Sequence, residues 1–191
     1  METKKLFTTI QAGKYKGKKL LLPSLERTRS TKSVLKGSFF DTFQYEIIDQ
    51  HFVEVFGGSG SMGLEALSRG AKHAYFIEYD QKAFSTLKEN CKSIDSNATT
   101  CYQGDAFKVL PTLLPSFTCK TIFYFDPPFS IREGMDEIYE KTLEVIAKIP
   151  PKCVHTVAIE HMTALSLPKS IGTLSLQKTK KFGKSSLSYY M

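Results

Sequence analysis

The sequence predicts an α/β protein in which helices cover both faces of a mostly parallel sheet. Two observations support this fold class. Strand-like and helix-like segments alternate from residue 51 to residue 159, as in consecutive βαβ units. Two later stretches that alternate apolar and polar residues, 171–178 and 185–190, flank a Lys-Lys-Phe-Gly-Lys segment and predict a hairpin with an antiparallel final strand.

The elements are expected in this order along the chain. Expected strands are short runs rich in apolar residues: 51–56, 73–79, 99–103, 120–125 and 153–159. Expected helices repeat apolar residues every three or four positions: 62–69, 81–93, 105–114 and 134–148. Gly70 ends the first of these helices and Pro115 ends the third. Residues 1–50 are basic with a helix-like stretch near 32–46, and we expect a small extension packed on a main domain of residues 51–191, effectively one domain.

Length and composition exclude several classes of protein. The chain has 191 residues, of which 41 % are hydrophobic and 24 % charged, a balance typical of a globular protein. No apolar run approaches the ~20 residues that span a bilayer, and no apolar segment follows the polar start as in a signal peptide. The cysteines form no Cys-x-x-Cys pair and the histidines have no metal-like spacing. We therefore expect free thiols in the cytoplasm, no membrane contact and no metal.

Charge is distributed unevenly along the chain. Residues 1–36 hold ten Lys and Arg against two acidic residues, and residues 161–191 hold five against none. Residues 37–160 hold eleven basic and seventeen acidic residues, so the formal net charge of +7 divides into +8, −6 and +5 in chain order. Such runs can be solvated surface. They also predict that the two basic ends contact a polyanion while the chemistry resides in the middle.

A glycine-rich loop follows the first expected strand of the main domain. Gly58, Gly60 and Gly63 satisfy G-x-G-x-x-G, in which glycine lets the backbone approach a nucleotide closely. The pattern is compatible with a plain strand–helix turn, a dinucleotide or S-adenosylmethionine. Glu54 lies just before the loop and would oppose the phosphates of a dinucleotide. S-adenosylmethionine carries an ammonium and a sulfonium and no phosphate, so Glu54 favours this cofactor.

Acidic residues follow the next two expected strands. Glu78 is placed to hydrogen-bond the ribose hydroxyls of either cofactor class, whereas Asp80 is expected to cap the following helix. Asp105 is a good N-cap for the helix that starts at 106, and its side chain or the adjacent backbone could also meet an adenine amino group. These acids support nucleoside binding without choosing between the cofactors.

The most specific motif is Asp126-Pro127-Pro128-Phe129 at the end of the 120–125 strand. An exocyclic base amine is a poor nucleophile because its lone pair is delocalised into the ring. The Asp126 carboxylate and the Pro127 carbonyl can accept its two N–H groups and orient the lone pair toward a methyl group. Proline stiffens the segment, and Phe129 offers a face on which a base can stack.

Together these segments resemble the bacterial 16S rRNA (guanine-N2) methyltransferase family, the RsmD-like enzymes. The resemblance covers nearly the whole chain: AGKYKGKKLLLP (12–23), residues 29–40, VEVFGGSGSMGLEALSRGA (53–71), FIEYD (76–80), DPPF (126–129), Glu160 and KKFGKSSLSYY (180–190). It implies a Rossmann-like class I methyltransferase fold with a mostly parallel seven-stranded sheet. It also implies S-adenosylmethionine as cofactor, S-adenosylhomocysteine as product, and a monomer that acts on 16S rRNA or the assembled small ribosomal subunit.

The resemblance also implies a set of site residues. The cofactor site would comprise Glu54, Phe56, Gly58, Ser59, Gly60, Glu78, Asp105 and Ala106, and the catalytic loop Asp126, Pro127, Pro128 and Phe129. The chain departs from the family pattern in having Glu54 for Asp and Gly57 for Ala. The stretch RSTKSVLKG (29–37) lacks the proline, the Asp and the Arg-Glu pair of the family motif R-P-T-x-D-x-x-R-E.

The basic ends are expected to hold RNA phosphates, with a contact that weakens steeply as salt rises. The residues concerned are Lys14, Lys16, Lys18, Lys19, Arg27 and Arg29, and in the tail Lys180, Lys181 and Lys184. This docking requires both ends to lie on the same side as the DPPF loop. Other functions stay open: an amino-nitrogen methyltransferase acting on adenine N6 or protein glutamine, an NAD(P)-dependent oxidoreductase, or a non-catalytic RNA-binding protein.

Overall fold

The computed structural model describes residues 6–23, 29–128 and 136–191, with only the backbone of 29–31 and 136. The strands are β1 (Phe7–Thr9), β2 (Lys19–Leu21), β3 (His51–Val55), β4 (His73–Glu78), β5 (Thr99–Gln103), β6 (Thr121–Phe125), β7 (Val154–Met162), β8 (Ser170–Ile171), β9 (Leu174–Phe182) and β10 (Ser185–Tyr190). The helices are α1 (Arg29–Thr42), α2 (Ser61–Ser68), α3 (Gln81–Ile94), α4 (Ala106–Leu113) and α5 (Asp136–Ala147).

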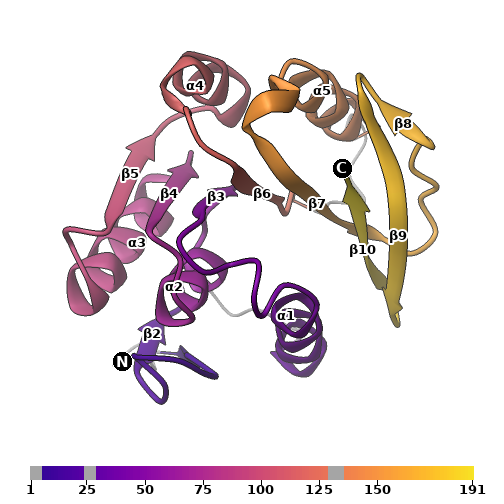
Figure 1. Cartoon of the computed structure of the whole chain (residues 1–191). Coiled ribbons are helices and arrows are strands. Elements are labelled where there is room, and N and C mark those ends of the chain that lie inside the picture. The colour runs from indigo at the N-terminus through magenta and orange to yellow at the C-terminus, as the bar shows by residue number, and fades with distance from the viewer. Residues whose placement is uncertain (1–5, 24–28, 129–135) are drawn as a thin grey trace.

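The main sheet is mixed, with the strand order β5-β4-β3-β6-β7-β10-β9-β8. Strands β5, β4, β3, β6 and β7 are parallel, whereas β10 runs antiparallel to both β7 and β9. The predicted α/β class and the antiparallel C-terminal strand are therefore confirmed. Figure 1 shows α1, α2 and α3 on one side of this sheet and α4 and α5 on the other.

The count of seven strands is wrong, because the described chain adds β8 at the edge of the sheet. The expected strand 171–178 is divided at Gly172, which adopts a left-handed φ of 57° and turns the chain between β8 and β9. Strand β7 also runs on to Met162, three residues beyond the expected end, because β10 pairs with it as far as Ser185.

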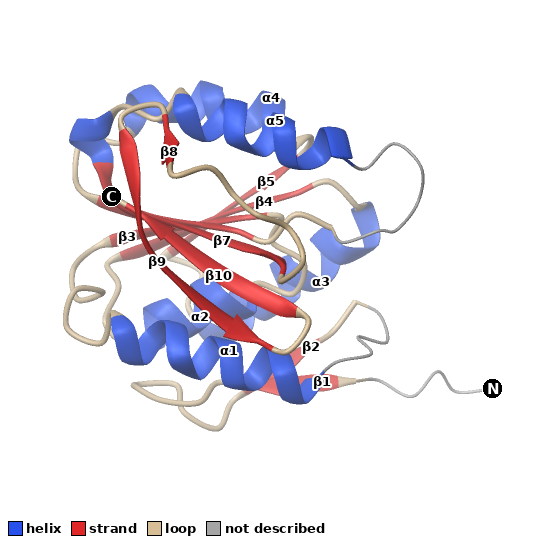
Figure 2. Ribbon diagram, turned by 90° about the vertical axis from the view of Figure 1, so that its right-hand side faces the viewer, coloured by secondary structure: helices blue, strands red, loops and turns tan. Residues whose placement is uncertain are grey.

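Alternation along the central strands divides the core into two layers. Phe52 and Tyr124 pack with residues of α1, α2 and α3, whereas Val53 and Phe125 pack with residues of α4 and α5. Successive side chains of a strand point to opposite faces, so strands this apolar must be covered on both. Figure 2 shows the resulting three layers, helices above and below the sheet.

Strands β1 and β2 pair antiparallel and form an N-terminal hairpin, which is bound to α2 through a buried carboxylate. Glu65 is fully buried and accepts hydrogen bonds from the backbone N–H groups of Gln11 and Ala12, at 2.8 and 3.0 Å. Lys36 of α1 and Arg69 pair with the same carboxylate at 3.3 and 2.8 Å. Four partners compensate the desolvation of this charge, and they join the hairpin, α1 and α2 into one body.

Among the described residues, no helix is long and apolar enough to cross a membrane.

Candidate active site

The acidic residues singled out in the sequence meet at one edge of the sheet. Glu54, Glu78 and Asp126 lie at or directly after the carboxyl ends of β3, β4 and β6. Strand β3 lies between β4 and β6, so the chain crosses over at this point and leaves a crevice outside the strand ends. Parallel order thus collects side chains that are far apart in the sequence.

Glu54 is buried at the N-terminus of α2. It is 5 % exposed, and its carboxylate accepts the backbone N–H of Gly63 at 2.7 Å and that of Met62 at 3.4 Å. Burial raises the pKa of the Glu54 carboxyl to about 8, and the nearby Asp126 adds to this rise. A cation that binds beside Glu54 would therefore favour loss of the proton from its carboxyl group.

The glycine loop needs its glycines for two different reasons. Gly60 has a left-handed φ of 76° at the N-cap of α2, a conformation that L side chains rarely adopt. At Gly63 a Cβ atom would lie 2.4 Å from the ring of Phe76, so α2 packs on β4 only without a side chain there. Phe56 has a positive φ of 67° although it is not glycine, a strain typical of functional loops.

Glu78 fixes the loop from the neighbouring strand. Its carboxylate accepts the backbone N–H of Gly58 at 2.7 Å and that of Asp80 at 2.7 Å. Asp80 caps α3 by accepting from the backbone N–H of Ala83 at 2.8 Å, which confirms its predicted role. Asp105 caps α4 in the same way, by accepting from the N–H of Phe107 at 2.9 Å.

Beside this loop is an open cleft of about 1050 Å³, large enough for a nucleoside. Its lining includes Phe56, Glu78 and Tyr79 at the ends of β3 and β4, and Asp105, Ala106 and Phe107 at the start of α4. The cleft also reaches Asp126 and Pro128. Tyr79, which is 76 % exposed, is not among the predicted site residues, although it directly follows Glu78, which is.

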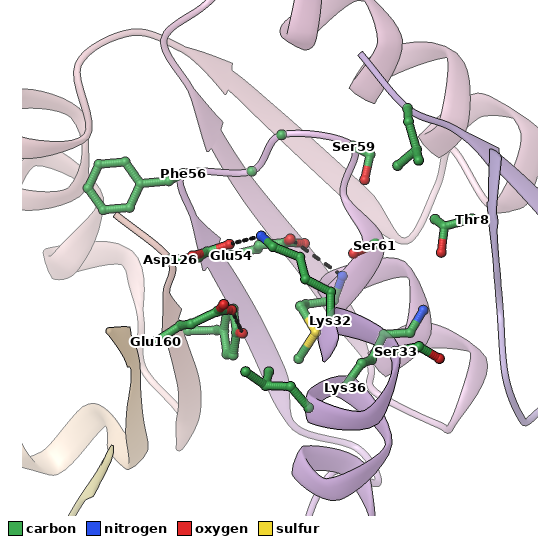
Figure 3. Close-up of a pocket in the computed structure, with 16 residues that line it drawn as sticks. Thr8, Lys32, Ser33, Lys36, Glu54, Phe56, Ser59, Ser61, Asp126 and Glu160 are labelled. Atoms are coloured by element: carbon green, nitrogen blue, oxygen red, sulfur yellow. Dashed lines mark hydrogen bonds and ion pairs between the residues drawn. The ribbon is translucent and has the colours of Figure 1, made fainter. Parts of the chain in front are cut away.

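A second, polar cavity adjoins the cleft at Phe56 and Asp126. Figure 3 shows the side chains that line it. They include Thr8, Lys32, Ser33, Lys36, Glu54, Phe56, Ser59, Ser61, Tyr124, Asp126 and Glu160. The predicted residues Glu54, Phe56, Gly58 and Ser59 are thus brought together with Asp126 around this cavity.

Asp126 is paired with a residue that the sequence analysis did not assign. Lys32 of α1 donates to the Asp126 carboxylate at 2.9 Å, with the two side chains 37 % and 23 % exposed (Figure 3). Pro127 is buried and Pro128 is exposed. Phe129, the predicted stacking residue, lies outside the described residues.

Tyr124 and Glu160 are buried residues that line the same cavity as Asp126. The Tyr124 hydroxyl donates to Glu160 at 2.9 Å, and the two residues are each 2 % exposed. Burial and the neighbouring carboxylates raise the pKa of Tyr124, so the phenol stays protonated and keeps donating. In the sequence, the only signal for Glu160 is its position directly after the apolar residues of β7.

The described lysines of the two basic ends do not share one face, so the predicted single docking surface is wrong for Lys14, Lys16 and Lys18. Lys14 donates its backbone N–H to Ser68 at the end of α2, and the Lys18 ammonium reaches Ser93 in the last turn of α3. Both helix ends lie at the amino edge of the sheet, because these helices start at its carboxyl edge. The turn with Lys14, Lys16 and Lys18 is therefore opposite the DPPF motif.

Two tail lysines, Lys181 and Lys184, lie on the same side of the sheet as Asp126. Lys181 and Lys184 flank the turn between β9 and β10. Ser185 at the start of β10 pairs with Met162 at the carboxyl end of β7, so this turn lies at the carboxyl edge of the sheet. Lys180 instead donates to the hydroxyls of Ser38 and Thr42 on α1, at 3.0 and 2.7 Å. Lys19 begins β2. Arg27 and the side chain of Arg29 lie outside the described residues.

Within the described ranges, no group of three or more His, Cys, Asp or Glu residues is arranged to hold a metal ion.

Strand order, glycine loop and acidic strand ends together define a Rossmann-like class I methyltransferase fold. Among solved structures, the Escherichia coli protein yhhF superposes with a TM-score of 0.76 at 25 % identity and 97 % coverage of both chains. A precorrin-6y C5,15-methyltransferase from Geobacter metallireducens superposes with a TM-score of 0.61 at 13 % identity, over 88 % of this chain and 92 % of that one.

The chain belongs to the family described as conserved hypothetical protein 95, whose model matches residues 8–191. Ribosomal RNA small subunit methyltransferase D of Escherichia coli K12 is 28 % identical over 174 residues, 91 % of this chain and 84 % of that protein. The protein of the same name from Haemophilus influenzae is 33 % identical over 124 residues, 63 % of each chain. The RsmD-like resemblance is therefore confirmed.

Asn90 supports the loop from α3 and yields a first prediction. Its amide group donates to the carbonyls of Ser59 and Leu21 at 2.8 and 2.9 Å and accepts from the Leu21 N–H at 2.9 Å. Asn90→Ala leaves these backbone groups without a partner, so we expect a loss of ~1–3 kcal/mol in unfolding free energy. Urea denaturation measures it. Asn97→Ala, at an exposed position of the same region, is the control; equal stability of both variants would contradict the assigned role.

Proposed function

We propose that the protein transfers a methyl group from S-adenosylmethionine to the exocyclic N2 amine of a guanine in 16S rRNA. The observation that carries this proposal is the position of Asp126, the acid before the two prolines, in the lining of the cavity that Glu54 and the glycine loop also line. The names of the E. coli and H. influenzae relatives support an rRNA substrate. We propose that the enzyme acts in the cytoplasm as a monomer, on free rRNA or on the assembled small subunit.

The residues present fit this cofactor. Glu54 is a buried acid with a raised pKa, suited to pair with an ammonium. Glu78 lines the open cleft, where its carboxylate would accept hydrogen bonds from ribose hydroxyls, and Asp105 and Ala106 line the same cleft, where they would meet the adenine. No atom lies within 4 Å of the position of a Cβ on Gly58, so the loop is open to a close approach. The bound cofactor supplies an electrophilic methyl group on a sulfonium.

The chain itself positions and desolvates the amine. The Asp126 carboxylate and the Pro127 carbonyl would accept the two N–H groups and favour the developing positive charge. We propose that Phe129 stacks on the extruded base. Lys181 and Lys184, on this side of the sheet, would hold flanking phosphates, with an affinity that falls steeply as salt rises.

The test is methylation of defined substrates with isotope-labelled S-adenosylmethionine. The substrates are naked 16S rRNA and small subunits from cells lacking the gene, an adenine-containing DNA duplex and a glutamine-containing protein extract. We expect one N2-methylguanine, located by mass mapping of 16S rRNA. Label found in N6-methyladenine or methylglutamine would show that the proposed substrate is wrong. Thermal stabilisation by NAD but not by S-adenosylmethionine would show that the proposed cofactor is wrong.

A further inference from the structure

Lys32 is a cation inside the polar cavity, and its place suggests a role in cofactor recognition. Its ammonium reaches the Asp126 carboxylate at 2.9 Å. Both side chains line the cavity that Glu54 and the glycine loop also line. In this arrangement the Lys32 ammonium occupies an oxygen of the Asp126 carboxylate, so that oxygen does not accept an N–H of a substrate amine.

S-adenosylmethionine brings an α-carboxylate as well as its cationic groups, so the polar cavity must also accommodate an anion. Glu54, Asp126 and Glu160 all line this cavity. A further carboxylate entering beside them needs a cationic partner, because like charges at short range are strongly unfavourable in a poorly hydrated site.

The second lysine of the cavity and two backbone N–H groups beside it already have partners. Two of its described lining residues are cationic, Lys32 and Lys36. Lys36 is 4 % exposed, pairs with buried Glu65 at 3.3 Å and donates to the Thr9 carbonyl. The N–H groups of Met62 and Gly63, at the start of α2, go to Glu54. Lys32 is the more exposed of the two lysines, and its long side chain can swing between partners.

We propose that Lys32 binds the α-carboxylate of S-adenosylmethionine and leaves Asp126 when it does so. This inference rests on the proposed function. Cofactor binding would then release the Asp126 carboxylate to accept the substrate amine, so that the cofactor prepares the site for the base. Lys32 is a specificity-determining residue for the cofactor in this scheme.

The test compares two cofactors that differ only in this carboxylate. Dissociation constants for S-adenosylmethionine and decarboxylated S-adenosylmethionine are measured by isothermal titration calorimetry. The proteins are the wild type, Lys32→Met, Lys32→Arg, and Lys152→Met as a control at an exposed position outside both cavities. We expect the wild type and the control to prefer the carboxylated cofactor by about tenfold or more, the size of a charge-assisted hydrogen bond.

The preference should fall at least about fivefold in Lys32→Met and be kept in Lys32→Arg. An unchanged preference in Lys32→Met would overturn the inference, even if both affinities fall together, because Lys32 would then not act on the carboxylate. A wild type that binds neither cofactor would instead overturn the proposed function. Thermal unfolding without ligand checks that each variant is folded.

Discussion

Asp126→Ala is expected to lower the rate of methyl transfer by about 10²–10³-fold, the loss typical of removing one preorganised acceptor or donor at a reacting group. The carboxylate lies directly after β6 and beside the cavity of Glu54, where it would bind the N–H of the amine. Single-turnover transfer to 16S rRNA, with enzyme in excess, measures this rate without product release.

Two further variants make the result specific. Asp126→Asn keeps one carbonyl oxygen as an acceptor, so its rate should lie between those of the wild type and Asp126→Ala. Glu140→Ala changes an exposed acid of α5 and should keep the full rate. Calorimetry should show that Asp126→Ala still binds the cofactor. An Asp126→Ala protein that keeps the wild-type rate would exclude Asp126 from catalysis.

Glu54→Gln is expected to make the free protein more stable while weakening cofactor binding. The Glu54 pKa rises from 4.5 to about 8 on folding because the carboxyl is buried. The folded state therefore keeps a proton that the unfolded state loses above pH ~4.5, so this group lowers stability progressively as pH rises from ~4.5 to ~8. Glutamine imitates the protonated acid and removes the effect, worth a few kcal/mol at pH 8.

The affinity for the cofactor should instead rise with pH, whereas the stability of the free protein falls. A cation beside Glu54 favours the ionised carboxylate, so binding near pH 7 should release up to ~1 proton and tighten from pH 6 to pH 8. Calorimetry in buffers of different ionisation enthalpy counts the proton, and Glu54→Gln should abolish its release. The same variant should bind more weakly by about tenfold or more at pH 8. Unchanged proton release in Glu54→Gln would show that another group titrates.

These two residues could be found in the sequence because each carries a local signal. Glu54 precedes a glycine loop between a strand and a helix, and Asp126 precedes two prolines after an apolar strand. Residues after parallel strands collect at one edge, so a correct strand assignment was enough to group them. The helix caps at Asp80 and Asp105 are local for the same reason, since the capped N–H groups lie two or three residues away.

Lys32 and Asn90 have no signal in the sequence because their partners are remote along the chain. Lys32 lies 94 residues from Asp126, and Asn90 lies 69 residues from Leu21. A lysine on a helix and an asparagine on another carry no periodicity that indicates such a partner. Packing of α1 and α3 against the same face of the sheet decides these contacts.

Residue patterns are enough to predict the α/β class, the antiparallel final strand and the acidic strand ends, because these depend on hydrophobic period and on local turn chemistry. The location of the charges depends on how the helices and strands pack together. Burial raises the pKa of Glu54, Lys32 is placed against Asp126, and the Lys14–Lys18 turn lies at the amino edge while Lys184 lies at the carboxyl edge. The location of a charged segment cannot be deduced from its net charge, because the length and direction of each helix determine at which edge of the sheet the next segment lies.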